Sequence, residues 1–299
     1  MKGNPLNHPV TDYILFSLLA LIWSSSFLFI KIAVADIPPM SITAIRLLIA
    51  AVLLYAWLRH QDLRLSVDKA DWAKFVFIGA VGNALPFFLI SFGEVSVDSG
   101  MAAILMGIMP IATVLLAHLV IPEEPFTRLK SLGVAIGFAG VITLVGWDAL
   151  GGLAETTFAQ LAILGAALCY AINAVFIRRM TTLTGTVMAT GSIICGCLII
   201  LPFALWLEQP WHIQASTASI VSVVILGVFP TAIATLILFR LIANLGASTL
   251  SQVNYVIPIL GAIWGIIFLG EALHTSAIIA LMMVLVGLAI VNHSRSETG

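Results

Sequence analysis

The chain has 299 residues, of which 61% are apolar and only 9% are charged, and its formal net charge is −1. Soluble domains carry about 25% charged residues, so this chain lacks the polar residues needed to cover one or two soluble domains of its length. The near-neutral charge also provides no basic face for a nucleic-acid partner. These properties indicate an integral membrane protein that lies in a lipid bilayer.

Apolar runs near the spanning length of roughly 20 residues follow one another along the chain. The first five runs are Tyr13–Ala35, Met40–Leu58, Trp72–Phe92, Ser99–Ile121 and Leu129–Trp147. The second five are Phe158–Ile177, Val187–Leu207, Ile220–Leu241, Ser248–Leu269 and Ser276–Asn292. They predict an all-α membrane protein with ten transmembrane helices. The acidic, glycine-rich stretch 148–157 is predicted to be a linker between a first unit, 1–147, and a second unit, 158–299.

Basic residues are unevenly distributed over the predicted connections. Of the 13 Lys and Arg residues, Lys31 and Arg46 fall inside predicted helices. The other basic residues all fall at the termini or in even-numbered connections, namely Lys2, Arg59, Arg64, Lys69, Lys74, Arg128, Lys130, Arg178, Arg179, Arg240 and Arg295. Because cytoplasmic loops are enriched in Lys and Arg, both termini are predicted to be cytoplasmic.

One sequence segment recurs near the end of each set of five predicted helices. Gly100–Glu123 aligns with Ser248–Glu271, and Pro110 then matches Pro258. Such a repeat indicates a duplicated membrane unit. Since each unit has an odd number of helices, the second must enter the membrane from the opposite side. The sequence therefore predicts two inverted five-helix repeats, the symmetry of alternating-access transporters. The glutamates at the ends of the two segments, Glu123 and Glu271, are predicted to stabilise the positive starts of the helices that follow them.

Motifs in both halves resemble a known family: Trp23-Ser-Ser-Ser-Phe27 followed by Lys31, Arg46 leading an apolar run, Gly100 with Ala102 and Ala103, Pro110 with Glu123, and Pro258 with Gly270-Glu271. With the helix count, these residues are similar to the tandem EamA-type repeats of the drug/metabolite transporter superfamily over nearly the whole chain. The chain departs from the family pattern at Pro122 and at Tyr170-Ala-Ile-Asn173. The resemblance implies a bacterial inner-membrane carrier, often an exporter of amino acids, other metabolites or lipophilic cations.

Prolines and polar side chains at membrane depth indicate a central site. A proline frees a backbone carbonyl and bends its helix, and in lipid such a carbonyl is tolerated only where protein or a watery cavity satisfies it. Polar side chains should likewise point inward. We therefore predict a substrate site lined by Trp23, Ser26, Asn83, Met106, Pro110, Tyr170, Asn173, Thr231, Gln252, Tyr255 and Pro258. Helix packing is the competing interpretation for each of them.

This lining is uncharged and partly aromatic, which suits a neutral or aromatic amino acid better than other substrates. Amides and hydroxyls offer hydrogen bonds to the charged groups of a zwitterion, and rings and methionines offer an adaptable apolar wall. A nucleotide sugar would call for buried Lys or Arg. Efflux of lipophilic cations, the alternative transport function, would predict a buried carboxylate.

Four charged residues near the external ends of predicted helices form a candidate gate: Lys31, Arg46, Glu94 and Asp98. Ion pairs among them, with Asp36 as a further partner, would form and break as the site opens. The alternative is that these side chains snorkel to the surface or form permanent ties.

Motifs that the sequence lacks limit the energy sources that could drive transport. The sequence has no G-x-x-x-x-G-K-[ST] phosphate loop, so we expect neither ATP hydrolysis nor a cofactor, and we predict no metal site. Every Asp and Glu falls at or near a predicted membrane surface, which favours gradient-driven transport over proton coupling. An intramembrane enzyme is disfavoured because neither H-E-x-x-H nor G-x-S-x-G occurs, and a scaffold would not require inverted duplication. The spacing Gly133-x-x-x-Gly137 lets the fifth helix pack closely on the tenth or on a second copy of the chain. Packing within the chain is the simpler interpretation, and a monomer is expected.

Overall fold

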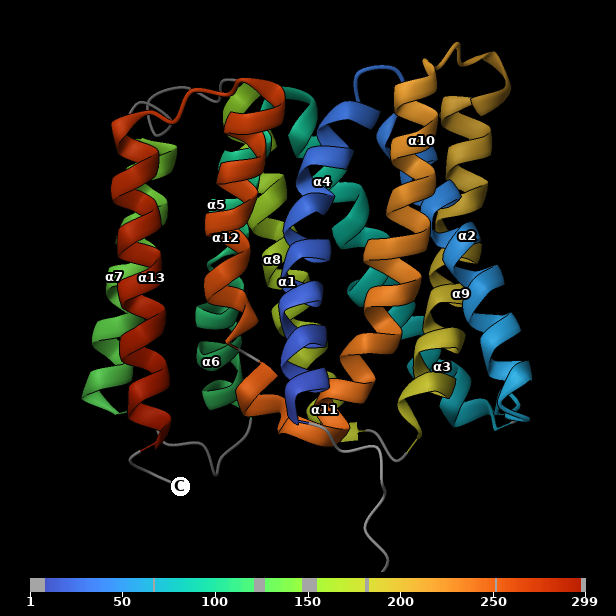
Figure 1. The fold of residues 1–299 in the computed structure, drawn as a ribbon, viewed down its shortest axis with the longest axis horizontal. Coiled ribbons are helices and arrows are strands. Elements are labelled where there is room, and N and C mark those ends of the chain that lie inside the picture. The colour runs from blue at the N-terminus through green and yellow to red at the C-terminus, as the bar shows by residue number, and fades with distance from the viewer. Residues whose placement is uncertain are drawn as a thin grey trace, which may run out of the picture.

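The computed structural model describes residues 9–66, 68–120, 127–146, 155–180, 183–250 and 252–296. Every regular element in these ranges is a helix, and the long helices stand side by side (Figure 1). The start of α1 and the end of α13 lie on the same side of the molecule, the lower side in Figure 1. The positive-inside rule assigns that side to the cytoplasm.

The first half contains five spans. They are formed by α1 (Pro9–Ala33), α2 (Pro39–His60), α3 (Lys69–Gly79) continued by the π-helical η1 (Ala80–Ala84) and α4 (Leu85–Ser96), α5 (Ser99–Met106) with α6 (Met109–Val120), and α7 (Arg128–Val145). The third and fourth spans are thus each built from more than one element, at the positions of Pro86 and Pro110.

The second half repeats this arrangement. Its spans are formed by α8 (Glu155–Met180), α9 (Gly185–Phe203) with the π-helical η3 (Ala204–Glu208), α10 (Thr217–Leu226) with the π-helical η5 (Gly227–Ile233) and α11 (Ala234–Leu250), α12 (Val253–Trp264) with the π-helical η6 (Gly265–Leu269), and α13 (Thr275–Ser296). A 3₁₀ turn, η4 (Pro210–His212), lies between the seventh and eighth spans. The predicted linker 148–157 falls largely outside the described residues.

Several helices begin where the sequence supplies a capping side chain. Asp68 accepts from Ala70 N at 3.0 Å before α3, Thr127 accepts from Lys130 N at 3.2 Å before α7, and Ser216 accepts from Ser219 N at 3.2 Å before α10. Each bond satisfies a backbone N–H that has no partner inside its own helix.

Among the described residues, nine helical segments are long and apolar enough to cross a membrane. The remaining span, Val253–Leu269, is shorter and starts later than the predicted Ser248–Leu269. The reason lies in α11, which extends to Leu250 across a kink at Gly246, where φ is +79°. A glycine adopts this conformation without the steric penalty of a side chain, so the chain turns here before α12 begins.

The packing of the helices relates the two halves by inverted symmetry. The third span packs on the seventh, where Gly79 faces Gly196, and the eighth span packs on the second, where Gly227 faces Ile49. An added Cβ at Gly79 would lie 2.6 Å from Ser192 O, and one at Gly227 would lie 3.1 Å from Arg46 O. The two contacts are equivalent under exchange of the halves, which supports the predicted inverted repeats.

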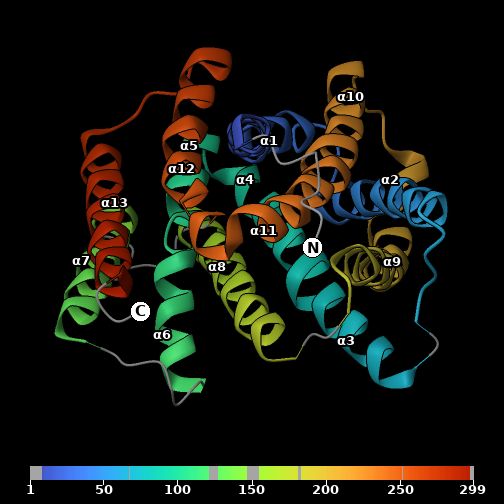
Figure 2. The same ribbon diagram turned by 60° about the horizontal axis from the view of Figure 1, so that its bottom comes forward.

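The fifth and tenth spans, α7 and α13, form a pair at one end of the molecule (Figure 2). Their backbones approach at glycines: an added Cβ at Gly133 would lie 2.6 Å from Gly287 O, and one at Gly287 would lie 2.6 Å from Gly133 O. The prediction that Gly133 serves packing within the chain is confirmed.

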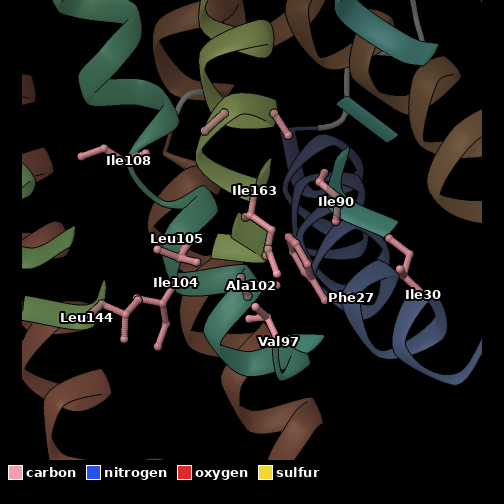
Figure 3. Close-up of a cluster of buried hydrophobic side chains, with 14 of the residues drawn as sticks. Phe27, Ile30, Ile90, Val97, Ala102, Ile104, Leu105, Ile108, Leu144 and Ile163 are labelled. Atoms are coloured by element: carbon pink, nitrogen blue, oxygen red, sulfur yellow. The ribbon is translucent and has the colours of Figure 1, made fainter. Parts of the chain in front are cut away.

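The largest buried apolar cluster draws on both halves (Figure 3). Phe27 of α1, Ile90 of α4 and Leu105 of α5 meet Ile163 of α8 there, and each is at most 6% exposed. The interface between the repeats is therefore the core of the molecule.

Candidate substrate site between the two halves

A proline in the eighth span creates the first element of the candidate site. Pro230 in η5 cannot donate to the carbonyl of Leu226, four residues earlier. Instead, Thr231 Oγ1 donates to Leu226 O at 2.8 Å. The hydroxyl thereby adds a hydrogen bond to the carbonyl that the proline cannot reach, and its oxygen can still accept a hydrogen bond.

Arg46 reaches this hydroxyl from α2. Its Nε donates to Thr231 Oγ1 at 2.7 Å, and its guanidinium carbon lies 3.7 Å from the centre of the Phe87 ring. The Phe87 ring meets the Tyr170 ring edge-on, with centres 6.5 Å apart. Arg46 is only 5% exposed, so it does not snorkel to a membrane surface. The group joins α2, α4, α8 and η5, and thus both repeats.

Lys31 and Asp98 make contacts other than the predicted gate pairs. Lys31 Nζ donates to the backbone carbonyls of Glu94 and Val97, at 2.9 and 2.8 Å, where a cation suits the negative end of α4. Asp98 is exposed at the start of α5 and makes no capping bond with its side chain. In this conformation, neither Lys31 nor Arg46 forms an ion pair with a carboxylate of the described residues. The gate itself stays a prediction.

Glu94 differs from what its sequence position suggests. It lies two residues before the end of α4, which indicates a depth near the membrane surface. Neighbouring helices nevertheless bury it completely, with 0% exposure, and neither carboxylate oxygen has a hydrogen-bond partner among the described residues. By its position, Glu94 thus stays near the predicted membrane surface, but the surrounding protein shields it from water.

Two predicted site residues, Asn83 and Asn173, lie along η1. Asn83 Nδ2 donates to Ile78 O at 3.3 Å, and Asn173 Oδ1 is buried with no hydrogen-bond partner in the part of the chain that the structure describes. The Asn173 amide packs directly on Gly82, where an added Cβ would lie 2.5 Å from Nδ2. The structure thus brings Asn173 to the irregular part of the third span, while the Asn83 amide donates within its own span. A role of either residue in substrate binding stays a prediction.

Residues of the first span, Trp23 and Ser26, make local contacts. Ser26 Oγ donates to Trp23 O at 2.6 Å, within α1. The Trp23 ring packs against a small apolar cluster that includes Ile237 and Leu241 of α11. Neither residue contacts the Arg46 group through a hydrogen bond, so helix packing accounts for both in this conformation.

Pro258 packs against the break in the fourth span, close in sequence to its repeat partner Pro110. The backbone leaves the α-helix at Gly107, between α5 and α6, with Met106 before it and Pro110 after it. An added Cβ at Gly107 would lie 3.2 Å from Pro258 Cγ. The structure therefore places the Pro258 ring against the break that precedes Pro110. Met106 is half-buried against the main core cluster.

The last two predicted lining residues, Gln252 and Tyr255, lie elsewhere. Gln252 is exposed at the start of α12. Tyr255 Oη donates to Leu288 O at 3.0 Å and accepts from Asn292 Nδ2 at 2.7 Å, which ties α12 to α13. The structure does not bring these two side chains to Arg46, and no short-range sequence signal distinguishes them from Asn173 or Thr231.

Three carboxylates hold helix starts across the boundary between the halves. Glu271 accepts from Ser99 N at 2.8 Å and Gly100 N at 2.9 Å at the start of α5. Glu208 accepts from Met40 N at 2.9 Å and from Ser41 N at 2.6 Å at the start of α2. Asp36 accepts from Ser216 N at 3.1 Å and from Ser219 Oγ at 2.7 Å at the start of α10.

These caps correct one prediction and add two contacts that sequence reasoning missed. Glu271 supports α5 of the other repeat, not the α13 helix that follows it, because a carboxylate stabilises whichever helix start it can reach. All three capped starts lie on the external side by the positive-inside assignment. The equivalent of Glu271 in the first repeat, Glu123, lies outside the described residues.

On the cytoplasmic side, α1 and α11 are tied by Asp12. Its carboxylate accepts from Asn244 Nδ2 at 3.0 Å and pairs with Arg240 Nε at 3.5 Å. A pocket on the external side is lined by Pro39, Phe92, Val95, Ser96, Phe158 and Ala159, none of which is a predicted substrate residue.

Comparison with known proteins shows the family to which the chain belongs. Residues 11–146 and 157–293 each match the family described as EamA-like transporter family. The uncharacterized transporter YdfC of Bacillus subtilis is 30% identical over 256 residues, which cover 85% of this chain and 82% of YdfC. The uncharacterized inner membrane transporter YedA of Escherichia coli K12 is 25% identical over 278 residues, covering 91% of this chain and 88% of YedA.

The fold has also been seen in a solved crystal structure. That chain is 18% identical, and the two superpose with a TM-score of 0.67 over 97% of this chain and 99% of the other. At this identity the likeness concerns the fold alone.

Proposed function

Because the chain belongs to the EamA-like transporter family and is a membrane transporter, we propose that it exports neutral or aromatic amino acids by alternating access. The substrate would cross at the interface between the two repeats. Arg46 carries this proposal, because it holds a buried positive charge at that interface, against the Phe87 ring.

The surroundings of Arg46 suit the carboxylate of an amino acid. A guanidinium is always charged and binds carboxylates through paired N–H donors. Thr231 uses only Nε of Arg46, and no described residue accepts a hydrogen bond from the two terminal nitrogens. Phe87 and Tyr170 supply apolar ring surface beside the charge, which suits an aromatic or aliphatic side chain.

A buried guanidinium also bears on the alternative, efflux of lipophilic cations. The buried Glu94 is the kind of carboxylate that this alternative predicts. The guanidinium, however, repels a positive ligand in a poorly screened site, so the Arg46 group favours a substrate that carries a carboxylate. The prediction of transport without proton coupling does not depend on Arg46. It rested on the absence of a carboxylate that is buried away from water.

The proposed cellular setting is the bacterial inner membrane, supported by the name of the relative YedA. A single chain supplies both halves of the proposed path, which supports function as a monomer. Export is the proposed direction because the resemblance to amino-acid exporters first suggested it.

The test is counterflow of labelled L-phenylalanine in liposomes that contain the purified protein. Unlabelled neutral, aromatic, acidic and basic amino acids and a cationic dye compete in parallel. L-Phenylalanine should exchange. 2-Phenylethylamine, which lacks the carboxylate, should exchange about 10- to 100-fold more slowly, because it loses one or two charge-assisted hydrogen bonds. Exchange of the dye alone would show that the amino-acid proposal is wrong.

Two variants connect the result to Arg46. Arg46→Gln should abolish the preference for L-phenylalanine over 2-phenylethylamine. The matched control is Arg240→Gln, which removes an arginine that pairs with Asp12 on the cytoplasmic side, and it should keep the preference. An unchanged preference in Arg46→Gln would show that the substrate carboxylate binds elsewhere.

A further inference from the structure

Glu94 is a buried acid that no contact in the protein explains. It is 0% exposed, and both of its carboxylate oxygens lack a hydrogen-bond partner among the described residues. Buried polar groups in native proteins are almost always hydrogen-bonded, and an exception calls for a reason. Three other carboxylates at this end, Glu271, Glu208 and Asp36, each accept at least two hydrogen bonds.

The charged groups around Glu94 have their own partners. Lys31 on α1, Arg46 on α2 and Glu271 after η6 act on it electrostatically. Lys31 donates to the carbonyls of Glu94 and Val97, Arg46 donates to Thr231, and Glu271 accepts from the start of α5. On α8, Tyr170 acts on Arg46, and Asp98, in the connection to α5, is exposed.

This arrangement leaves the protonation of Glu94 open to change. Burying an ionised carboxylate without hydrogen bonds is strongly unfavourable, and a neutral carboxyl avoids most of that penalty. Lys31 and Arg46 favour the ionised form, whereas Glu271 favours the neutral form. Small movements of these groups, or entry of water, would therefore change which form is stable.

Glu94 also lies where the two repeats meet. The preceding residue, Gly93, packs so closely on α8 that an added Cβ would lie 2.8 Å from Ala159 O and 2.7 Å from Ile163 Cδ1. Glu271 approaches from the second repeat as well. Alternating access requires the repeats to rearrange against each other, and that rearrangement would alter the burial and charge neighbours of Glu94.

We propose that Glu94 is a proton-binding site that couples substrate movement to proton movement. The Glu94 carboxylate binds a proton from one side of the membrane, carries it through the rearrangement of the repeats, and releases it to the other side. This inference rests on the proposed alternating-access transport, and it replaces the sequence-based expectation of transport without proton coupling.

The first test needs neither substrate nor variant. Dicyclohexylcarbodiimide, an apolar reagent that attacks protonated carboxyl groups, is added to the wild-type protein in liposomes, and mass spectrometry locates the adduct. Glu94 should be modified at neutral pH, and modification should fall as the pH rises. Glu208, whose carboxylate accepts three hydrogen bonds, is the internal control and should stay unmodified. Lack of modification at Glu94 at every pH would overturn the proposal.

The second test measures coupling. Liposomes with a difference of one pH unit across the membrane should accumulate or deplete labelled L-phenylalanine up to about tenfold for one proton per substrate, and a protonophore should abolish the effect. Glu94→Gln should lose the response, whereas Glu208→Gln should keep it. If L-phenylalanine undergoes counterflow but ignores the gradient, the coupling proposal is wrong. If counterflow itself fails, the amino-acid proposal is wrong, and the carbodiimide result still decides whether Glu94 binds a proton.

Discussion

The hydrogen bonds of Thr231 offer a sharp test of how the second and eighth spans are held together. Thr231→Val replaces the hydroxyl by a methyl group of similar size. It removes the acceptor of Arg46 Nε and the donor to Leu226 O, at 2.7 and 2.8 Å. Thr231 is 2% exposed, so water does not readily replace either bond.

The expected loss follows from these two bonds. Hydrogen bonds to charged groups contribute about 1.5–3 kcal/mol in proteins, and neutral ones about 0.5–1.5 kcal/mol. Measured values inside membranes are lower, with a maximum of about 1.7 kcal/mol. Taking about 1.5 kcal/mol for the Arg46 bond and about 1 kcal/mol for the Leu226 carbonyl, we expect Thr231→Val to lower the free energy of unfolding by about 2.5 kcal/mol.

The assay is reversible unfolding in mixed micelles, followed by helix content. Thr235→Val is the matched control, because Thr235 Oγ1 donates only to Thr231 O within its own helix; it should change the free energy by less than about 0.5 kcal/mol. A double-mutant cycle with Arg46→Met should give a coupling energy of about 1 kcal/mol or more. Equal effects of the two threonine changes, or an additive cycle, would refute the proposed role of Thr231.

Three further predictions concern other contacts. Gly265→Ala would place a Cβ against the Glu271 carboxylate and should cost about 0.5–2 kcal/mol of unfolding free energy through the lost cap, whereas Gly165→Ala, whose Cβ would meet only Leu89 Cδ1 at 3.5 Å, should be tolerated in the same assay. Gly287→Ala should cost about 1–3 kcal/mol by forcing α13 off α7, and a stability equal to that of Gly165→Ala would contradict this packing. Hydrogen bonds from Ser216 and then Ser219 lower the pKa of Asp36 from its ordinary value of 3.8. Because the folded-state pKa is depressed, the stabilisation by Asp36 should be complete above pH 3.8 and disappear as the pH falls through the lower folded value; Asp36→Asn should lack that component of the acid unfolding curve.

The sequence was sufficient to predict the spans, because lipid imposes a length and an apolar composition on each of them. It was also sufficient for the inversion, since five helices per repeat and the bias of basic residues leave one arrangement. The predicted start of the ninth span was wrong by several residues. Hydropathy does not separate two helices that follow each other closely, and the residues up to Leu250 belong to the end of α11, which continues past the kink at Gly246.

The predicted site was harder to obtain from sequence because its contacts are between distant residues. Arg46 and Thr231 are 185 positions apart, and nothing near either residue identifies the other. The adjacent residues Pro230 and Thr231 did give a local signal, because the Thr231 hydroxyl can donate a hydrogen bond to the carbonyl that Pro230 frees. For Glu94, position along the helix indicated depth, but burial depends on α1, α5 and α8, whose packing no local pattern specifies.

In the proposed alternating-access cycle, the three carboxylate caps on the external side would affect the speed of outward opening. That step would have to separate Glu271, Glu208 and Asp36 from helices of the opposite repeat, and the two caps whose carboxylates are partly buried, Glu271 and Glu208, contribute about 1 kcal/mol each. If these two break before water replaces them, they add about 2 kcal/mol to the barrier, which slows the step by about 30-fold. Their donors include backbone N–H groups at all three helix starts, which side-chain substitution cannot remove. The rate of outward opening is therefore adjustable mainly through these three acidic residues.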